Sequence, residues 1–376
     1  MQSGKMKSPI VFAALALLSG LVLGQAQVAF TSLYIFGDGI STTTNNPSAG
    51  PYYYGLRRSN GRVWVEVLAQ RQGLGANSIT NVNWSNSTNN WSYYGQYSPN
   101  LVMNLNGFHA PADAATALFV VWVNDADFVN DMGTIYPSLN LATWTNAVNQ
   151  SLTNHWRVIT NLYYAKGART LVMPKAVDIT EIPQYNGNPA ADKSFIRQRI
   201  IEFNTGFMAL LNQARTSLPG ITIYEPDFFT LLDNMLTNAA AYGLTNVLSD
   251  GQSADVIEDD SLSDKSLNGP GTNYIFWDAV DPTAKAHEVL AEVVQQLIAP
   301  VQIGKINPFT GSNRLDVVNT PVGLNGFVDG TTNLRLTNWA AAVNIPGTNT
   351  MQSVFVPTSG SLQFYRLRFP YSWTWP

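Results

Sequence analysis

Residues 33–41, Leu33-Tyr-Ile-Phe-Gly-Asp-Gly-Ile-Ser41, decide the fold that we expect for this chain. The unbroken apolar run at the start of this stretch is typical of a strand that is buried on both faces of a sheet. The Gly-Asp-Gly that follows favours a tight turn at the end of that strand. Such a turn is suited to presenting a nucleophile at position 39, but Gly39 has no side chain.

The same apolar pattern recurs along the chain and alternates with helical periodicity. Further buried strands are predicted for the runs 117–122, 169–173 and 221–224. Helices are predicted for the segments 63–72, 141–165, 196–214 and 284–298. The clearest of them has apolar residues at intervals of three and four from Ile196 to Ala214, which gives one apolar face. This alternation predicts an α/β fold whose parallel sheet is covered by helices on both faces.

The amino-terminal residues have the pattern of an export signal. Lys5 and Lys7 precede an apolar run at 10–23, and small residues follow as far as Ala26. The run is shorter than the roughly 20 residues that a membrane-spanning helix needs. We therefore predict a signal peptide at 1–26, removed on export, and a secreted or periplasmic bacterial protein with no membrane span afterwards.

The remaining chain divides by composition into two parts. Residues 27–300 carry the alternating strands and helices of the α/β domain. Residues 305–376 are rich in Thr, Asn, Gly and Pro, with short alternating apolar runs that are typical of a small all-β module. The aromatic residues of this C-terminal module would form either a packed sandwich core or a platform for carbohydrate.

Charge and cysteine content exclude several classes of function. Loss of the two lysines of the signal peptide takes the formal net charge from −4 to −6, which argues against a nucleic-acid partner. The chain has no cysteine, so disulfides and thiol chemistry are excluded. The sequence indicates no cofactor and leaves the oligomeric state open.

Six blocks, in order along the chain, resemble the GDSL-type (SGNH) ester hydrolases. They are FGDGIS (36–41), SNGRVWVEVLA (59–69), NWSYYG (90–95), VNDADF (123–128), NAAAYGLTNV (238–247) and FWDAVDPTAKAH (276–287). The likeness covers roughly residues 32–298. It implies a three-layer α/β/α sandwich with a flavodoxin-like parallel sheet and an activity on acyl esters, in which a serine attacks the carbonyl, a histidine takes its proton and an aspartate orients the histidine.

The resemblance gives a functional role to five positions, and at two of them the side chain is not the one that the family uses. Gly95 and Asn124 match the donors that hold the oxyanion, and Asp278 matches the triad aspartate. Gly39 occupies the nucleophile position, and Asp281 occupies the histidine position. Because an ordinary carboxylate has a pKa of about 4, it is a poor acceptor for the proton of a hydroxyl.

Each substituted position also has a structural interpretation. Glycine tolerates a strained turn without steric cost. An aspartate before Pro282 suits the N-cap of the following helix. Asp38 is expected to shape its own turn through hydrogen bonds to the backbone. Alternatively, Asp38, Asp278 and Asp281 converge, and either bind a divalent cation or raise the pKa of one member.

Other reactive groups are available as substitutes: Ser41, Thr42, Thr43, His109, His155 and His287. The three hydroxyls follow the turn and are expected to point away from the site. His287 is expected to be a residue of the last helix, and the other two histidines have no acid pattern nearby in the sequence.

These observations predict an esterase-like protein with impaired catalysis, whose pocket binds an ester, an acyl group or an acetylated sugar. One alternative is an active hydrolase with a rearranged site, in which Asp38, Asp281 or His287 activates water. A second alternative is a carbohydrate-binding or surface-interaction protein that depends on the C-terminal module.

Overall fold

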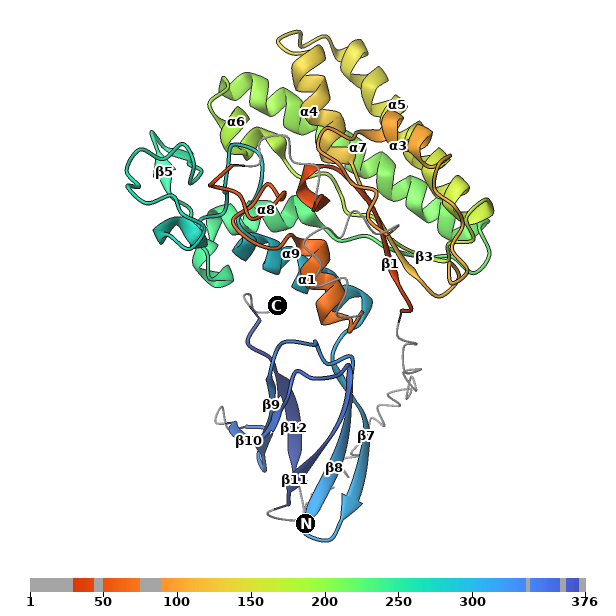
Figure 1. Cartoon of the computed structure of the whole chain (residues 1–376), viewed down its shortest axis with the longest axis vertical. Helices are drawn as coiled ribbons and strands as arrows, with labels where there is room; N and C mark the ends of the chain where they lie inside the picture. Colours follow the sequence, from red (N-terminus) through yellow and green to blue (C-terminus); the bar gives the residue numbers. More distant parts are fainter. Residues whose placement is uncertain (1–29, 44–49, 75–88, 336–338, 359–362, 372–376) are drawn as a thin grey trace, which may run out of the picture.

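The computed structural model of the chain combines an α/β domain with a smaller β domain (Figure 1). It describes residues 30–43, 50–74, 89–335, 339–358 and 363–371. The predicted signal peptide lies outside these residues. Within them, no helix has the length and apolar character needed to cross a membrane.

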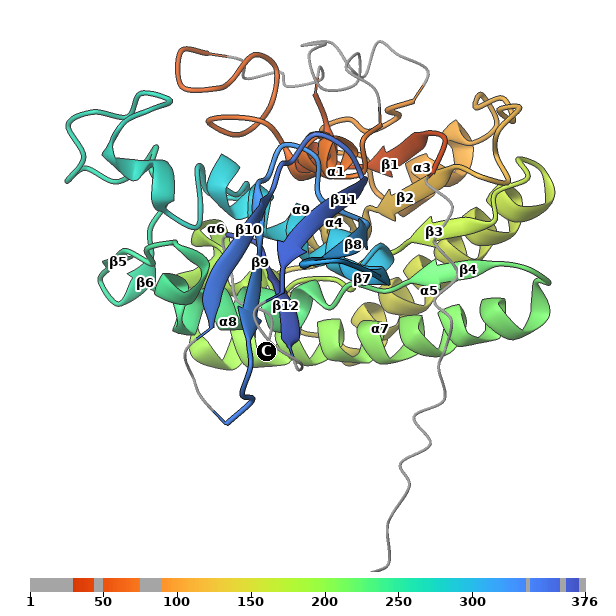
Figure 2. The ribbon, with the colours of Figure 1, turned by 90° about the horizontal axis from the view of Figure 1, so that it is seen from below.

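Four parallel strands form the central sheet, in the order in which they follow along the chain (Figure 2). They are β1 (Leu33–Gly37), β2 (Leu118–Trp122), β3 (Thr170–Val172) and β4 (Thr222–Tyr224). All residues of β1 and β2 are buried, as expected for a strand covered on both faces. The predicted parallel sheet is therefore confirmed.

The outer edge of β1 carries one further parallel contact. Asn90 forms an isolated bridge with Ile35 on the side of β1 away from β2. The chain therefore passes first to one side of β1 and then to the other. Such a reversal is the switch point at which open α/β sheets bind ligands, outside the carboxyl ends of the strands.

Helices cover both faces of the sheet (Figure 1). One face carries α1 (Trp64–Arg71), α8 (Phe228–Thr237) and α9 (Ala284–Ile298). The other carries α3 (Ser98–Asn104), α4 (Asn124–Thr134), α5 (Leu141–Tyr164) and α7 (Ala190–Ser217). Shorter elements join them: η1 (Gly39–Ser41), η3 (Ile179–Glu181), α6 (Pro183–Asn186), η4 (Ala239–Tyr242), β5 (Leu248–Ser249), β6 (Gln252–Ser253) and η5 (Pro270–Asn273).

The apolar face predicted for the helix at 196–214 is the buried face of α7. Its buried apolar residues are Ile196, Ile200, Phe203, Phe207, Leu211 and Ala214. The helix packs along α5, and Phe203 also contacts Phe128 of α4 edge to face. The three-layer α/β/α sandwich is thus the architecture of this domain.

The C-terminal residues form two antiparallel sheets of three strands. One has the order β11 (Met351–Pro357), β8 (Ser312–Val318) and β7 (Gln302–Phe309). The other has the order β10 (Ala340–Ile345), β9 (Gly326–Thr331) and β12 (Phe364–Arg368). Aliphatic side chains fill the core between them: Leu315, Val317, Val328, Ile345, Val354 and Val356. This part of the chain is the all-β module, and its core is packed with aliphatic rather than aromatic residues.

Hydrogen bonds connect the β module to α1 and α9. Arg71, the last residue of α1, forms a buried ion pair with Glu292 of α9 (3.1 Å). The carbonyl of Arg71 accepts the N–H of Val322 (3.2 Å), and its guanidinium donates to the carbonyl of Val322 (3.3 Å). Gln295 of α9 donates to the carbonyl of Asn319 (3.3 Å). The module is attached on the side of the domain where these two helices lie.

Candidate functional site

A pocket of about 280 Å³ lies at the carboxyl ends of β1 and β2. Its walls are mostly apolar and come from loops and helices that are far apart in the sequence. Its apolar lining includes Ile40, Ala126, Val129, Val177, Ile179, Ile182 and Val280. Its polar lining includes Asp38, Tyr94, Tyr97, Asp125, Asn130, Gln184 and Asp281. This is the position predicted by the switch point of the sheet.

The turn after β1 forms part of the pocket wall. The carboxylate of Asp38 accepts the N–H of Ile40 (3.0 Å) and caps the short helix η1, which confirms that Asp38 shapes its own turn. Gly39 does not have the positive φ that would demand glycine, so the expectation of a strained turn is wrong. A Cβ at this position would lie 3.1 Å from Cδ2 of Tyr94. The backbone at position 39 does not require glycine. The effect of Gly39 is therefore the absence of a reactive side chain, and not the relief of backbone strain.

Arg58 lies beside the nucleophile position and pairs with both triad-like carboxylates. Its Nε donates to Asp281 (2.8 Å) and its Nη2 donates to Asp278 (3.0 Å). Its guanidinium also stacks over the ring of Tyr94, 4.4 Å from the centroid. Arg58 could not be predicted from the sequence, because no spacing or motif connects it with residues that lie more than 200 positions away.

The two carboxylates are held in one network. Asp278 accepts the hydroxyl of Tyr53 (2.8 Å) and the N–H of Asp281 (2.8 Å). Burial raises the pKa of Asp281 well above its ordinary value, as does the charge of Asp278, while Arg58 opposes this shift. Burial and the neighbouring Asp278 also raise the pKa of Tyr53. The position that the family fills with histidine is thus occupied by a buried carboxyl group in an ion pair.

The interpretation of Asp281 as an N-cap is wrong. The helix α9 begins at Ala284, and its N-cap is Thr283, whose hydroxyl accepts the N–H of Ala286 (3.2 Å). Asp281 stands too far before the first residue of α9 to cap that helix. Its carboxylate pairs with Arg58 instead.

The carboxylates do not form a metal site in the part of the chain that the structure describes. No group of three histidine, aspartate or glutamate side chains there could hold a metal ion. Asp278 and Asp281 are neutralised by Arg58, whereas Asp38 is bonded to its own turn. The predicted convergence of the three carboxylates therefore produces an ion-pair network, and not a ligand set for a metal ion.

Of the two residues predicted to hold the oxyanion, one lines the pocket and the other does not. Gly95 lines the pocket and has a φ of 79°, a conformation that favours glycine. Asn124 is buried at the start of α4 and does not line the pocket. Its amide donates to the carbonyl of Pro174 (2.8 Å). In this conformation Asn124 does not face the pocket, and both oxyanion roles stay predictions.

Asp125, the neighbour of Asn124, lines the pocket instead. One of its oxygens accepts the N–H of Val177 (2.8 Å). The other, Oδ2, is buried and has no hydrogen-bond partner among the described residues. Burial raises the pKa of Asp125, and the charge of Asp38 raises it further. Asp125 stands inside the VNDADF block but was not predicted as a site residue, because the resemblance gives a role only to the asparagine of that block.

The hydroxyl groups after the turn do not line the pocket. Ser41 is buried and accepts the indole N–H of Trp64 (3.0 Å). Thr42 donates its hydroxyl to the carbonyl of Ser92 (3.1 Å), and Thr43 is also buried. Their expected orientation away from the site is confirmed.

The three histidines also lie away from the pocket. His287 belongs to α9, as expected, where burial lowers its pKa to about 3 and Nδ1 accepts the N–H of Trp64 (3.2 Å). His109 is exposed. His155 is buried in α5, and burial lowers its pKa although the charge of Asp127 opposes this shift. No acid pattern stands near His155 in the sequence, but folding brings α4, which carries Asp127, beside α5.

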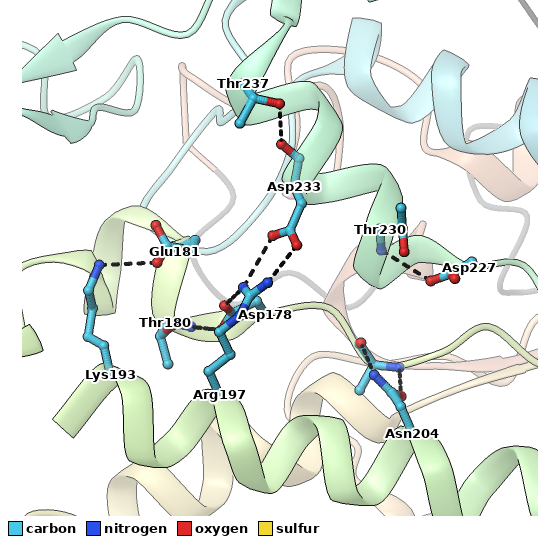
Figure 3. A network of polar contacts seen from close by, with 11 residues as sticks. Asp178, Thr180, Glu181, Lys193, Arg197, Asn204, Asp227, Thr230, Asp233 and Thr237 are labelled. Carbon is cyan, nitrogen blue, oxygen red and sulfur yellow. Dashed lines mark hydrogen bonds and ion pairs between the residues drawn. The ribbon is translucent and has the colours of Figure 1, made fainter. Parts of the chain in front are cut away.

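A polar network fixes the loop that forms one wall of the pocket (Figure 3). Asn204 of α7 accepts the N–H of Ala176 and donates to its carbonyl, both at 2.9 Å. Arg197 of the same helix pairs with Asp178 at the start of η3 and with Asp233 of α8 (2.6 Å). These contacts hold the segment that carries the apolar wall residues 177, 179 and 182.

A parallel α/β sheet, a pocket at its switch point and the GDSL-type turn at that pocket together define an esterase-like fold. The chain belongs to the GDSL-like lipase/acylhydrolase family, which matches residues 33–294.

Two similar proteins of Arabidopsis thaliana match over most of their length. GDSL esterase/lipase At1g71250 is 24% identical over 325 residues, covering 72% of this chain and 86% of that protein. GDSL esterase/lipase 7 is 24% identical over 344 residues, covering 76% and 94%. Among solved structures, the acetylxylan esterase Axe2 of Geobacillus stearothermophilus superimposes with a TM-score of 0.40 and 10% identity, over 73% of this chain and 96% of that one.

Proposed function

We propose that this chain is an exported esterase-like protein that does not cleave esters through a seryl intermediate, and that its pocket binds a ligand with an apolar body. The observation that carries the proposal is the pairing of Arg58 with Asp281 beside Gly39. The nucleophile position has no reactive atom, and the base position holds a carboxyl group that is already bonded to a cation. Export rests on the pattern of the amino-terminal residues.

Acyl transfer through a serine needs both a hydroxyl nucleophile and a general base. A seryl ester requires a hydroxyl within reach of a general base, and no hydroxyl after the turn lines the pocket. A base must also accept the proton of that hydroxyl, and an ion pair with Arg58 (2.8 Å) competes for the oxygen that would do so. What is retained is the pocket with its apolar walls, which suits the acyl part of an ester, a free acyl group or an acetylated sugar.

The test is direct. The mature protein is incubated with short p-nitrophenyl esters and with a fluorophosphonate probe, beside an active GDSL esterase as positive control. We expect no covalent labelling and no turnover above the uncatalysed rate. Turnover with labelling would refute the proposal. Turnover without labelling would instead favour a hydrolase with a rearranged carboxylate site. If EDTA abolishes that turnover, a metal-assisted hydrolase is favoured.

A further inference from the structure

The pocket contains more acidic groups than basic ones. Asp38, Asp125 and Asp281 line it, and Asp278 lies directly behind Asp281. The only cation in contact with this group among the described residues is Arg58, which is shared between Asp278 and Asp281. No lysine or arginine there pairs with either of the other two carboxyl groups. An excess of carboxylates opposes an oxyanion or a fatty carboxylate and favours a cation.

The unsatisfied oxygen of Asp125 is an independent sign of a ligand. This residue is only 4% exposed, yet Oδ2 has no hydrogen-bond partner among the described residues. The indole N–H of Trp122 faces this carboxylate and lowers its pKa, but its geometry falls short of a hydrogen bond to Oδ2. A buried polar atom without a partner is costly, and a buried charge without a counter-charge is more so. A group that brings both a hydrogen-bond donor and a positive charge would remove both costs.

We propose that the pocket binds a primary ammonium ion with an apolar tail, and that the ammonium group donates to Oδ2 of Asp125 and to the carboxylate of Asp38. The tail would lie against the apolar wall that includes Val129, Ile179 and Ile182. The volume of about 280 Å³ is near the lower limit of the roughly 300–1,000 Å³ of ligand pockets, so a short or medium-length tail is suited to it. This inference rests on the proposed function, because it identifies the head group of the ligand that the pocket retains without cleaving it.

The experiment compares head groups on one tail. Octylamine, octyltrimethylammonium, octanol and octanoate are titrated into the mature protein by isothermal calorimetry at slightly alkaline pH, below the pKa of the amine. We expect octylamine to bind at least about ten-fold more tightly than octanol, a difference in free energy of about 1.4 kcal/mol. The quaternary ion should bind more weakly than the primary one because it donates no hydrogen bond, and octanoate should not bind.

Matched variants assign the contact to one side chain. Asp125→Asn keeps the shape but removes the charge, and we expect it to weaken octylamine by about ten-fold or more while leaving octanol unchanged. Asp260→Asn, at an exposed aspartate outside the pocket, serves as the control and should bind octylamine as the wild type does. If octanol binds as tightly as octylamine, or if Asp125→Asn has no effect on octylamine, the inference is wrong.

A further test uses only the wild-type protein and is therefore independent of whether a variant folds. Burial raises the pKa of Asp38 to about 7, with a contribution from the charge of Asp127. The nearby Asp281 carries its own counter-ion in Arg58. An ammonium group should therefore displace protons from the pocket near neutral pH, which calorimetry in buffers of different ionisation enthalpy detects. Binding of octylamine without proton release contradicts the inference.

Failure of the inference and failure of the proposed function are distinguishable. If octanol binds as tightly as octylamine, the pocket binds an apolar ligand and only the proposed ammonium head group is wrong. If none of the four compounds binds and the protein labels with fluorophosphonate, the proposed function itself fails.

Discussion

Replacement of Arg58 by glutamine tests whether this residue holds the altered site together. The side chain of Arg58 is 12% exposed, and the side chains of its partners Asp278 and Asp281 are 8% and 2% exposed. Removing one partner of a buried ion pair leaves an uncompensated charge and costs about 3–5 kcal/mol. Since Arg58 retains some contact with solvent, we expect Arg58→Gln to lower the free energy of unfolding by about 3 kcal/mol at neutral pH.

The loss of stability caused by Arg58→Gln should increase with pH. The pKa of Asp281 is already raised in the folded protein, and the loss of Arg58 raises it further. A carboxyl group of this kind binds more protons in the folded state than in the unfolded state, so stability falls as the pH rises above the unfolded pKa of about 4. The penalty of Arg58→Gln should therefore be smallest below the folded pKa of Asp281 in the wild type, grow as the pH rises through that pKa, and level off above the still higher folded pKa in the variant.

Urea unfolding of the wild type and the variant across this pH range measures the effect. Lys193→Gln is the matched control, because Lys193 forms a more exposed ion pair with Glu181 (3.2 Å) and should cost no more than about 1 kcal/mol. Adding Asp281→Asn to Arg58→Gln removes the unpaired charge and should restore part of the stability. A penalty for Arg58→Gln that is no larger than that of the control, or that does not change with pH, would refute this account of the site.

Two further predictions concern the chemistry and the wall of the pocket. Gly39→Ser combined with Asp281→His should give little hydrolysis of p-nitrophenyl esters, and turnover should increase when Arg58→Ser is added, because Arg58 otherwise holds the carboxylate that must orient the histidine. Equal turnover with and without the third change contradicts that blocking role. Asn204→Ala leaves two buried backbone groups without partners and should lower the free energy of unfolding by about 1–3 kcal/mol in urea. Asn149→Ala, at an exposed position, is the control and should change it by no more than about 0.5 kcal/mol.

Much of the fold could be predicted because it depends on local patterns. The strands β1 and β2 are continuous apolar runs, and the buried face of α7 follows its periodicity from Ile196 to Ala214. The helix predicted at 284–298 has the bounds of α9, but the Asp-Pro pair at 281–282 suggested the wrong capping residue. Hydrogen bonds and not residue preferences decide where a helix begins, and Thr283 makes the capping bond.

The candidate site could be predicted only in part. The ordered blocks led to Gly39, Gly95 and Asp281, which line one pocket. They did not lead to Asp125, because the resemblance carries no information about which neighbour faces a cavity. They also gave no sign that the amide of Asn124 is bonded to Pro174, a contact that depends on the path of a distant loop.

The sequence by itself determined the family, the α/β class and the absence of a reactive side chain at position 39, because apolar periodicity, block order and residue identity are properties of the chain alone. Only the tertiary structure decided what replaces the missing chemistry. Arg58 meets Asp278 and Asp281 across more than 200 residues, and Asp125 meets Asp38 at the ends of two strands. The energies of charges depend on burial and on distances between atoms, and both are set when the strands and loops come together.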